Sequence, residues 1–94
     1  TEDVENEDDI TAMLLIFRGI AFRGKGLHEA ALECFKRALA KKDRSQEILH
    51  RARWERADTY IAMGKKSMAI KDLEKILVDD PSYDGVSEKL DSLR

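Results

Sequence analysis

The sequence is similar to itself at a distance of 38 residues, and this repeat limits the folds that are open to the chain. The segment FRGKGLHEAALECFKRAL (22–39) aligns with YIAMGKKSMAIKDLEKIL (60–77). The shared positions hold an aromatic residue, a glycine, an alanine and three bulky apolar residues: Phe22 with Tyr60, Gly26 with Gly64, Ala31 with Ala69, Leu32 with Ile70, Phe35 with Leu73 and Leu39 with Leu77. A period between about 20 and 50 residues is typical of stacked helical units. The pattern therefore predicts one helical unit that occurs twice.

The apolar residues recur at spacings of three and four, which is the period of a helix and not of a strand. In the first segment they are Ile10, Met13, Leu14, Phe17, Ala21 and Phe22. Glycines at 26 and 64 are placed to end helices in the left-handed conformation, and Pro81 prevents a helix from continuing. The sequence predicts an all-α domain of five helices, over residues 10–23, 27–42, 46–63, 67–78 and 83–93. Ser45, Ser67 and Ser82 precede or begin predicted helices, so we expect them to act as caps.

Residues 1–9 hold six acidic side chains and one apolar side chain. Such a composition buries too little apolar surface to offset the entropy of ordering, and it predicts a flexible tail or linker. The folded domain is then expected over residues 10–94.

Charge and composition exclude several classes of function. The chain has 94 residues and a formal net charge of −2, so no broad attraction to nucleic acid or to an anionic membrane is expected. The longest apolar run, AMLLIF (12–17), is shorter than the roughly 20 residues that span a bilayer. HRARWER (50–56) places arginines around Trp54, as some nucleic-acid sites do, but Glu55 and Asp58 dilute the charge. The single cysteine, Cys34, allows no internal disulfide and indicates a reducing compartment, which we take to be the cytoplasm.

One segment imitates a nucleotide site. GIAFRGKG (19–26) has the spacing of a phosphate-binding loop, but Gly26 stands where the motif needs a hydroxyl, and the residues before it have a helical period. His28 and His50 have no partner at metal-ligand spacing, and we expect both to be exposed. The sequence thus predicts no catalytic residue, no cofactor and no metal. A nucleotide-binding enzyme remains the alternative that magnesium-dependent binding of ATP would reveal.

The repeat resembles the tetratricopeptide repeat family, whose units are helix-turn-helix pairs of about 34 residues. The matching residues of the first unit are Gly19, Phe22, Gly26, Ala31, Phe35 and Ala38. Those of the second unit are Ala57, Tyr60, Gly64, Ala69, Leu73 and Pro81. The sequence departs from the family at Arg53 and Asp43, and its period is four residues longer. The resemblance implies a right-handed stack of two repeats, about 11–44 and 46–81, followed by a capping helix at about 83–93.

The resemblance also implies a function in binding protein. In this family the first helix of each unit lines a concave groove that holds a peptide or a partner helix. The positions that correspond in this chain are Met13, Ile16, Ile20 and Arg23 from the first unit, and Arg51, Trp54, Asp58 and Ile61 from the second. These residues predict a largely apolar groove in which Trp54 anchors the ligand. The alternative for each apolar residue is that it packs against the neighbouring helices.

A second surface is predicted on the first helix, because TAMLLIFRGIAF is apolar around most of its circumference. The end of a helical stack normally presents a polar face to water. We therefore expect Leu14 and Phe17 to mediate self-association or docking to an adjacent domain. In this alternative interpretation the chain is a dimerisation or scaffold domain of a larger regulatory protein, and its groove is filled by its own chain.

Overall fold

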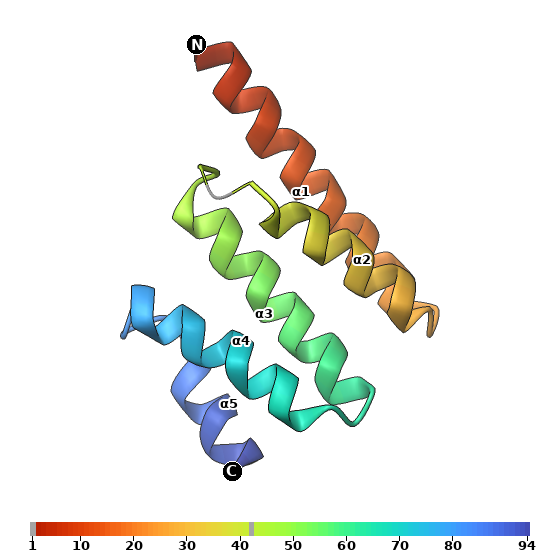
Figure 1. The fold of residues 1–94 in the computed structure, drawn as a ribbon, viewed down its shortest axis with the longest axis vertical. Coiled ribbons are helices and arrows are strands. Elements are labelled where there is room, and N and C mark those ends of the chain that lie inside the picture. Colours follow the sequence, from red (N-terminus) through yellow and green to blue (C-terminus); the bar gives the residue numbers. More distant parts are fainter. Residues whose placement is uncertain (1, 42) are drawn as a thin grey trace.

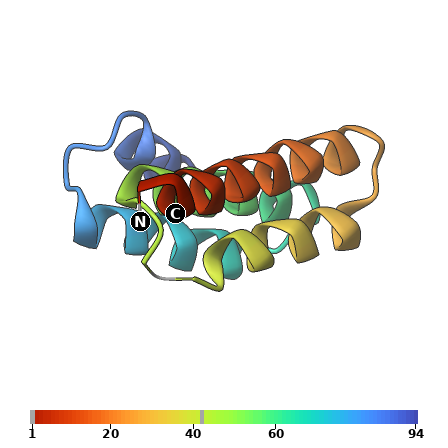
Figure 2. The same cartoon turned by 90° about the horizontal axis from the view of Figure 1, so that it is seen from above.

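The computed structural model describes residues 2–41 and 43–94, with side chains from residue 8 onward, and over this range it contains helices and no strand. The five helices are α1 (Glu2–Gly24), α2 (His28–Leu39), α3 (Gln46–Ala62), α4 (Lys66–Asp79) and α5 (Val86–Leu93). They form two helix-turn-helix pairs, α1 with α2 and α3 with α4, and α5 packs against the end of the second pair (Figure 1). Figure 2, seen from above, shows α1, α3 and α5 in an upper layer and α2 and α4 in a lower layer, so that the molecule is a stack of helices. The prediction of an all-α repeat fold with five helices is confirmed.

The first helix begins at Glu2 and not at Ile10, so residues 2–9 continue α1 and do not form the predicted flexible tail. Acidic side chains are favourable in the first turns of a helix because they interact with the positive end of its dipole. Asp8 adds a tertiary contact, since it lies 3.1 Å from Nε of Arg44 and 3.2 Å from Nζ of Lys41. Residue 1 lies outside the described residues.

The two glycines that the repeat aligned make the same turn. Gly26 has φ +79° and Gly64 has φ +76°, and both lie in the left-handed region that an L side chain rarely adopts. After each glycine, one backbone N–H reaches back to close the preceding helix: Leu27 N donates to Phe22 O at 2.9 Å, and Lys65 N to Tyr60 O at 2.8 Å. Because the segment before Gly26 is the end of α1, the strand that a phosphate-binding loop needs is not there.

The first pair of helices packs around Phe35, which is fully buried together with Ala12, Ile16 and Ala31. Gly19 makes this close packing possible. A Cβ atom on Gly19 would lie only 2.5 Å from Cε1 of Phe35. The small residue in α1 is therefore needed for the approach of α2.

The second pair has its own core, formed by Leu73, Ile76 and Ala57 and closed by Val86 and Leu90 of α5. Val86 and Leu90 recur one turn apart and are both buried, so that α5 covers the apolar face that α3 and α4 leave open. α5 begins at Val86 and not at residue 83.

The connection between α2 and α3 is held by Arg44, which is buried. Its Nη1 donates to the backbone oxygens of Arg37 at 2.9 Å and Ala38 at 2.7 Å, near the carboxyl end of α2. A cation at this end of a helix satisfies carbonyl groups that have no partner within the helix. The lengthened repeat period thus includes a residue that attaches the connection to α2 and, through Asp8, to α1.

Of the three serines predicted as caps, one is confirmed. Oγ of Ser45 accepts the backbone N–H of Ile48 at 3.3 Å and begins α3. The prediction is wrong for Ser67, which lies inside α4, and for Ser82, whose hydroxyl bonds to Asp80 in the turn before α5.

Candidate partner-binding surface

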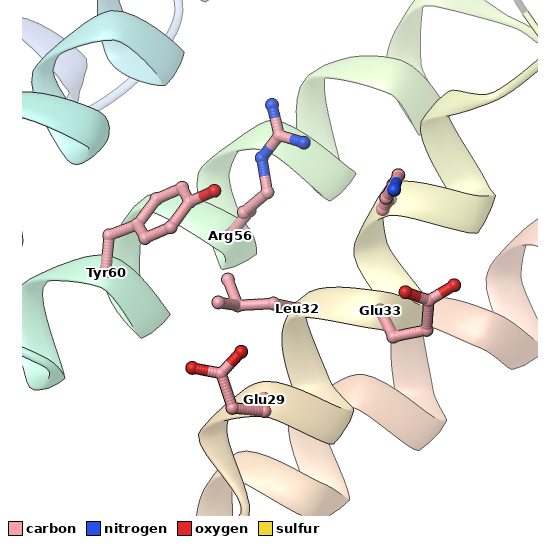
Figure 3. A pocket seen from close by; sticks show the side chains of 6 residues that line it. Glu29, Leu32, Glu33, Arg56 and Tyr60 are labelled. Carbon is pink, nitrogen blue, oxygen red and sulfur yellow. The ribbon is translucent and has the colours of Figure 1, made fainter.

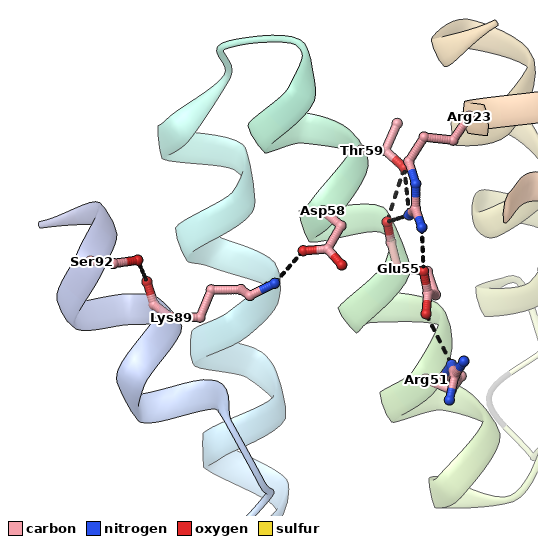
Figure 4. A network of polar contacts seen from close by, with 7 residues as sticks. All are labelled: Arg23, Arg51, Glu55, Asp58, Thr59, Lys89 and Ser92. Atoms are coloured by element: carbon pink, nitrogen blue, oxygen red, sulfur yellow. Dashed lines mark hydrogen bonds and ion pairs between the residues drawn. The ribbon is translucent and has the colours of Figure 1, made fainter. Parts of the chain in front are cut away.

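The predicted groove residues of α1 and α3 meet at a buried carboxylate. Nη2 of Arg23 lies 2.8 Å from Oε1 of Glu55, and Nε of Arg51 lies 3.0 Å from Oε2 of the same residue (Figure 4). Nη1 of Arg23 also donates to the backbone oxygen of Glu55 at 2.9 Å. One carboxylate thus binds the arginine at the end of α1 and the arginine one turn earlier in α3. The groove arginines that the sequence predicted are brought together, with part of their charge already neutralised.

A second contact joins α3 to α5. Lys89 of α5 donates to Asp58 and places its ammonium group 4.3 Å from the centroid of the Trp54 ring. Gly85 approaches the six-membered ring of the indole, because a Cβ atom there would lie 3.2 Å from Cη2 of Trp54. Tyr83 lies 6.2 Å from the Trp54 ring between centroids, and burial raises the pKa of its phenol. Trp54 is therefore half-buried beneath the last helix of the chain.

The remaining predicted groove residues divide by burial. Ile16 is fully buried in the first core, so it cannot contact a partner, and its prediction as a binding residue is wrong. Its side chain belongs to the core cluster that also contains Phe35 of α2 and Ala52 of α3. Met13, Ile20 and Ile61 are half-buried and pack against the two cores, which leaves part of each side chain accessible.

Sequence reasoning did not identify Glu55 and Lys89, the two residues that organise this surface. Glu55 lies four residues after Arg51 in a helix, and this spacing is a signal for an ion pair. No local pattern connects Lys89 with Asp58, which lies 31 residues earlier and on another helix. Only the packing of α5 against the second pair reveals that contact.

A pocket of about 210 Å³ lies between α2 and α3, away from these residues (Figure 3). Glu29 and Glu33 line one wall, and Arg56 and Tyr60 line the other. Arg56 already forms two short bonds with Asp72 of α4, at 2.8 and 2.6 Å, and this hydrogen bonding raises the pKa of its guanidinium. The pocket is therefore lined by groups of mixed charge, and its arginine is already paired with Asp72.

The histidine prediction is wrong for His50, which is buried and not exposed. Its ring meets Tyr83 edge to face, with centroids 5.5 Å apart, and its Nε2 lies 3.7 Å from a carboxylate oxygen of Asp79. His28 is half-buried at the start of α2. His50 is buried because the turn between α4 and α5 places Tyr83 against its ring. The sequence pattern alone could not show that this turn packs over α3.

The arginines around Trp54 all lie beside carboxylates. The closest distances are 3.0 Å for Arg51 to Glu55, 3.9 Å for Arg53 to Asp79 and 2.6 Å for Arg56 to Asp72. These pairs lower the local positive charge of HRARWER, the segment that a nucleic-acid surface would use.

Cys34 is buried in α2, and burial raises the pKa of its thiol. Within residues 2–41 and 43–94, no helix is long and apolar enough to cross a bilayer. Over residues 8–41 and 43–94, whose side chains are described, no group of three histidine, cysteine, aspartate or glutamate side chains could hold a metal ion.

The predicted self-association residues are both at the surface. Leu14 is 59% exposed and Phe17 is 55% exposed, and Ile10, one turn before Leu14, is 58% exposed. These are large apolar side chains on one helix, and Phe17 lies about one turn from the groove residues Met13 and Ile20.

Comparison with known proteins agrees with the repeat in the sequence. Residues 50–77 match a family model described as a tetratricopeptide repeat, and the matched segment covers most of α3 and α4. Neither the curated proteins nor the solved structures give a match. The match supports the resemblance to this family for the second helix pair, and the self-similarity of the sequence extends it to the first.

Proposed function

We propose that this tetratricopeptide-repeat-like domain is a protein–protein interaction module that binds a peptide or a partner helix along the face shared by α1 and α3. Repeats of this family generally mediate contacts between proteins. The proposal includes no enzymatic activity, no cofactor and no nucleic-acid ligand. It also includes a cytoplasmic location, which the single buried cysteine supports.

The observation that carries the proposal is the state of Arg51. Its side chain is half exposed and uses Nε for Glu55, so that its two terminal nitrogens have no partner among the described residues. Beside it on the same helix lies the half-buried Trp54, and Ile20 of α1 lies one turn before the Arg23 that shares its carboxylate. An arginine with free donors next to aromatic and aliphatic surface is a common composition of binding hot spots.

This composition indicates the chemistry of the ligand. Apolar side chains of the ligand cover Ile20 and the exposed part of Trp54, and one acidic group bonds to the free nitrogens of Arg51. Because Arg23 and Asp58 are already paired within the domain, a uniformly acidic segment gains little there. An amphipathic segment with a single carboxylate fits this surface best.

The proposal can be tested without a known partner by selecting binders from a random peptide library displayed on phage. Trp54 is the only tryptophan of the chain, so its emission reports directly on ligand binding at this face. We expect the selected peptides to shift the Trp54 emission. We expect Arg51→Ala to weaken their binding by at least about tenfold, which is about 1.4 kcal/mol.

Val78→Ala is the matched control, because Val78 is exposed on α4, away from the groove. It should leave the affinity unchanged. If the selected peptides bind equally well to Arg51→Ala and do not alter the Trp54 emission, the groove is not the binding surface. If no peptide is enriched over an unrelated helical protein, the proposed function itself is wrong.

A further inference from the structure

We propose that the outer face of α1 binds a second copy of this chain in an antiparallel helix pair. The face is a row of four apolar residues, called here the α1 row: Ile10, Leu14, Phe17 and Ala21. All four are exposed, and the three large ones are between 55% and 59% exposed. The inference uses other residues than those assigned to the peptide groove, and its test is separate from that of the proposed function.

The α1 row lies opposite the side of α1 that enters the core of its own chain. Ala12, Ile16 and Gly19 are buried against α2, and they are offset from the row by about two residues, which is roughly half a turn of helix. Figure 1 shows α1 at the end of the stack. Within the described part of the chain, the large side chains of the row therefore remain open to solvent.

The spacing of the row matches a helix-pairing seam. The steps from Ile10 to Leu14, to Phe17 and to Ala21 are four, three and four residues. Alternation of threes and fours places apolar side chains along one stripe that a second helix can cover with interlocking packing. An isolated exposed apolar residue has no such order, and is common on protein surfaces.

The row is complementary to itself when the second helix runs in the opposite direction. With the two-fold axis midway between Leu14 and Phe17, each Leu14 lies opposite Phe17 of the partner subunit. Each Ile10 then lies opposite Ala21 of the partner subunit. The seam consists of four layers with the same pairs on both sides of the axis, as a closed two-fold dimer requires. The large Ile10 at one end of the row thus faces the small Ala21 at the other end.

Charge selects the antiparallel direction. In sequence, six acidic residues lie within 2–9 at the start of α1, whereas the exposed Lys25 follows directly after its carboxyl end. In the antiparallel register given above, Asp8 and Asp9 lie opposite residues 23 and 22 of the partner subunit, close to Lys25 of the partner subunit. An antiparallel pair also opposes the two helix dipoles. A parallel pair would place the two acidic ends together.

The expected dimer is weak because the row is short. It spans eleven residue steps, or about 16 Å of helix, and buries less than the roughly 800 Å² per partner of a standard stable interface. We therefore expect a dissociation constant in the micromolar range, on the order of 10 to 100 μM.

The test is the mass of the full chain as a function of concentration, measured by sedimentation equilibrium. The wild type should pass from the monomer mass to twice that mass. Leu14→Glu and Phe17→Glu should each weaken the dimer by at least about tenfold, since each buries a charge in the seam. Val78→Glu, at a residue that is 77% exposed on α4, is the matched control and should dimerise as the wild type does. Circular dichroism confirms that each variant is folded.

The register is tested by disulfide formation with Cys34→Ala as the background, so that the introduced thiol is the only one. A mixture of Leu14→Cys and Phe17→Cys should cross-link faster than either variant alone, because these two positions face each other across the axis. A monomer at all concentrations, or a dimer that both glutamate variants retain, overturns the proposal. Faster cross-linking of Leu14→Cys with itself overturns the antiparallel register. Peptide binding at the groove should persist in Leu14→Glu, which keeps the outcome separate from that of the proposed function.

Discussion

Replacing Gly19 with alanine should destabilise the domain, although alanine is the better helix former. Gly19 lies inside α1, where its Cα faces the ring of Phe35. A Cβ atom there would lie 2.5 Å from Cε1, 2.7 Å from Cζ and 3.1 Å from Cδ1 of that ring. Carbon atoms in contact lie at least about 3.5 Å apart, so α1 or the ring has to move by roughly 1 Å. Phe35 is fully buried in the first core and has little room for this movement.

Two opposing effects set the size of the destabilisation by Gly19→Ala. Adding a methyl group to a packed core typically costs about 1–3 kcal/mol, and contact with three ring atoms places this site in the upper part of that range. The higher helix propensity of alanine returns about 1 kcal/mol. We expect a net loss of about 1–2 kcal/mol in the free energy of unfolding. For a domain of this size, that loss lowers the melting temperature by about 5–15 °C.

Urea denaturation followed by circular dichroism at 222 nm measures this difference. Gly24→Ala is the matched control in the same helix, because no atom lies within 4 Å of its Cβ position and its φ is not positive. It should be neutral or stabilising by up to about 1 kcal/mol. Adding Phe35→Leu to Gly19→Ala removes the clashing ring atoms, so the losses of the two changes should not add. If Gly19→Ala is as stable as Gly24→Ala, the close approach of α2 to Gly19 is not what requires the glycine.

Three other changes test separate contacts. Gly85→Ala places a side chain at φ +83° and 3.2 Å from the ring of Trp54. The substitution should lower the free energy of unfolding by about 1–2 kcal/mol and alter the tryptophan emission. An unchanged emission spectrum would contradict this packing. Asp72→Asn leaves Arg56 without its carboxylate and should cost about 2–3 kcal/mol in urea denaturation, less than for a fully buried pair because a quarter of the arginine side chain is exposed; a neutral effect would refute the pair. Hydrogen bonding with Arg44 lowers the pKa of Asp8 from 3.8, so the stability that this carboxylate adds is present above pH 3.8 and is lost as the pH falls through the lowered folded-state pKa. The stability advantage of the wild type over Asp8→Asn should therefore disappear in acid. An advantage that does not depend on pH would exclude the charge of Asp8 as its cause.

The helix pattern could be predicted because its causes are local. The three-and-four spacing of apolar residues and the glycines at 26 and 64 act within one or two turns of the chain. The structure confirms both turns and all five helices, with small shifts at most ends. The large error, at the start of α1, has a physical reason. Composition indicated disorder for residues 1–9, but the favourable interaction of acidic residues with the positive end of the helix dipole and the contact of Asp8 with Arg44 favour continuation of the helix.

The candidate surface could be predicted only in part. The family resemblance identified Arg23, Arg51 and Trp54, and the structure brings the two arginines to one carboxylate. The family resemblance could not show that the side chain of Ile16 is turned into the core. A shift of one residue along a helix rotates a side chain by about 100°, so a position read from a degenerate repeat can face either the groove or the neighbouring helix.

The sequence by itself determined that the chain is a pair of helical units with glycine-closed turns, and that the first helix has an apolar outer face. The tertiary structure decided which polar groups are still available to a partner. Glu55 lies 32 residues from Arg23, and Lys89 lies 31 residues from Asp58. Such pairs form only after the helices have packed, because their distance depends on the approach and rotation of whole helices and not on any local pattern. That packing half-buries Trp54, leaves Arg51 with unused donors and keeps Leu14 and Phe17 exposed.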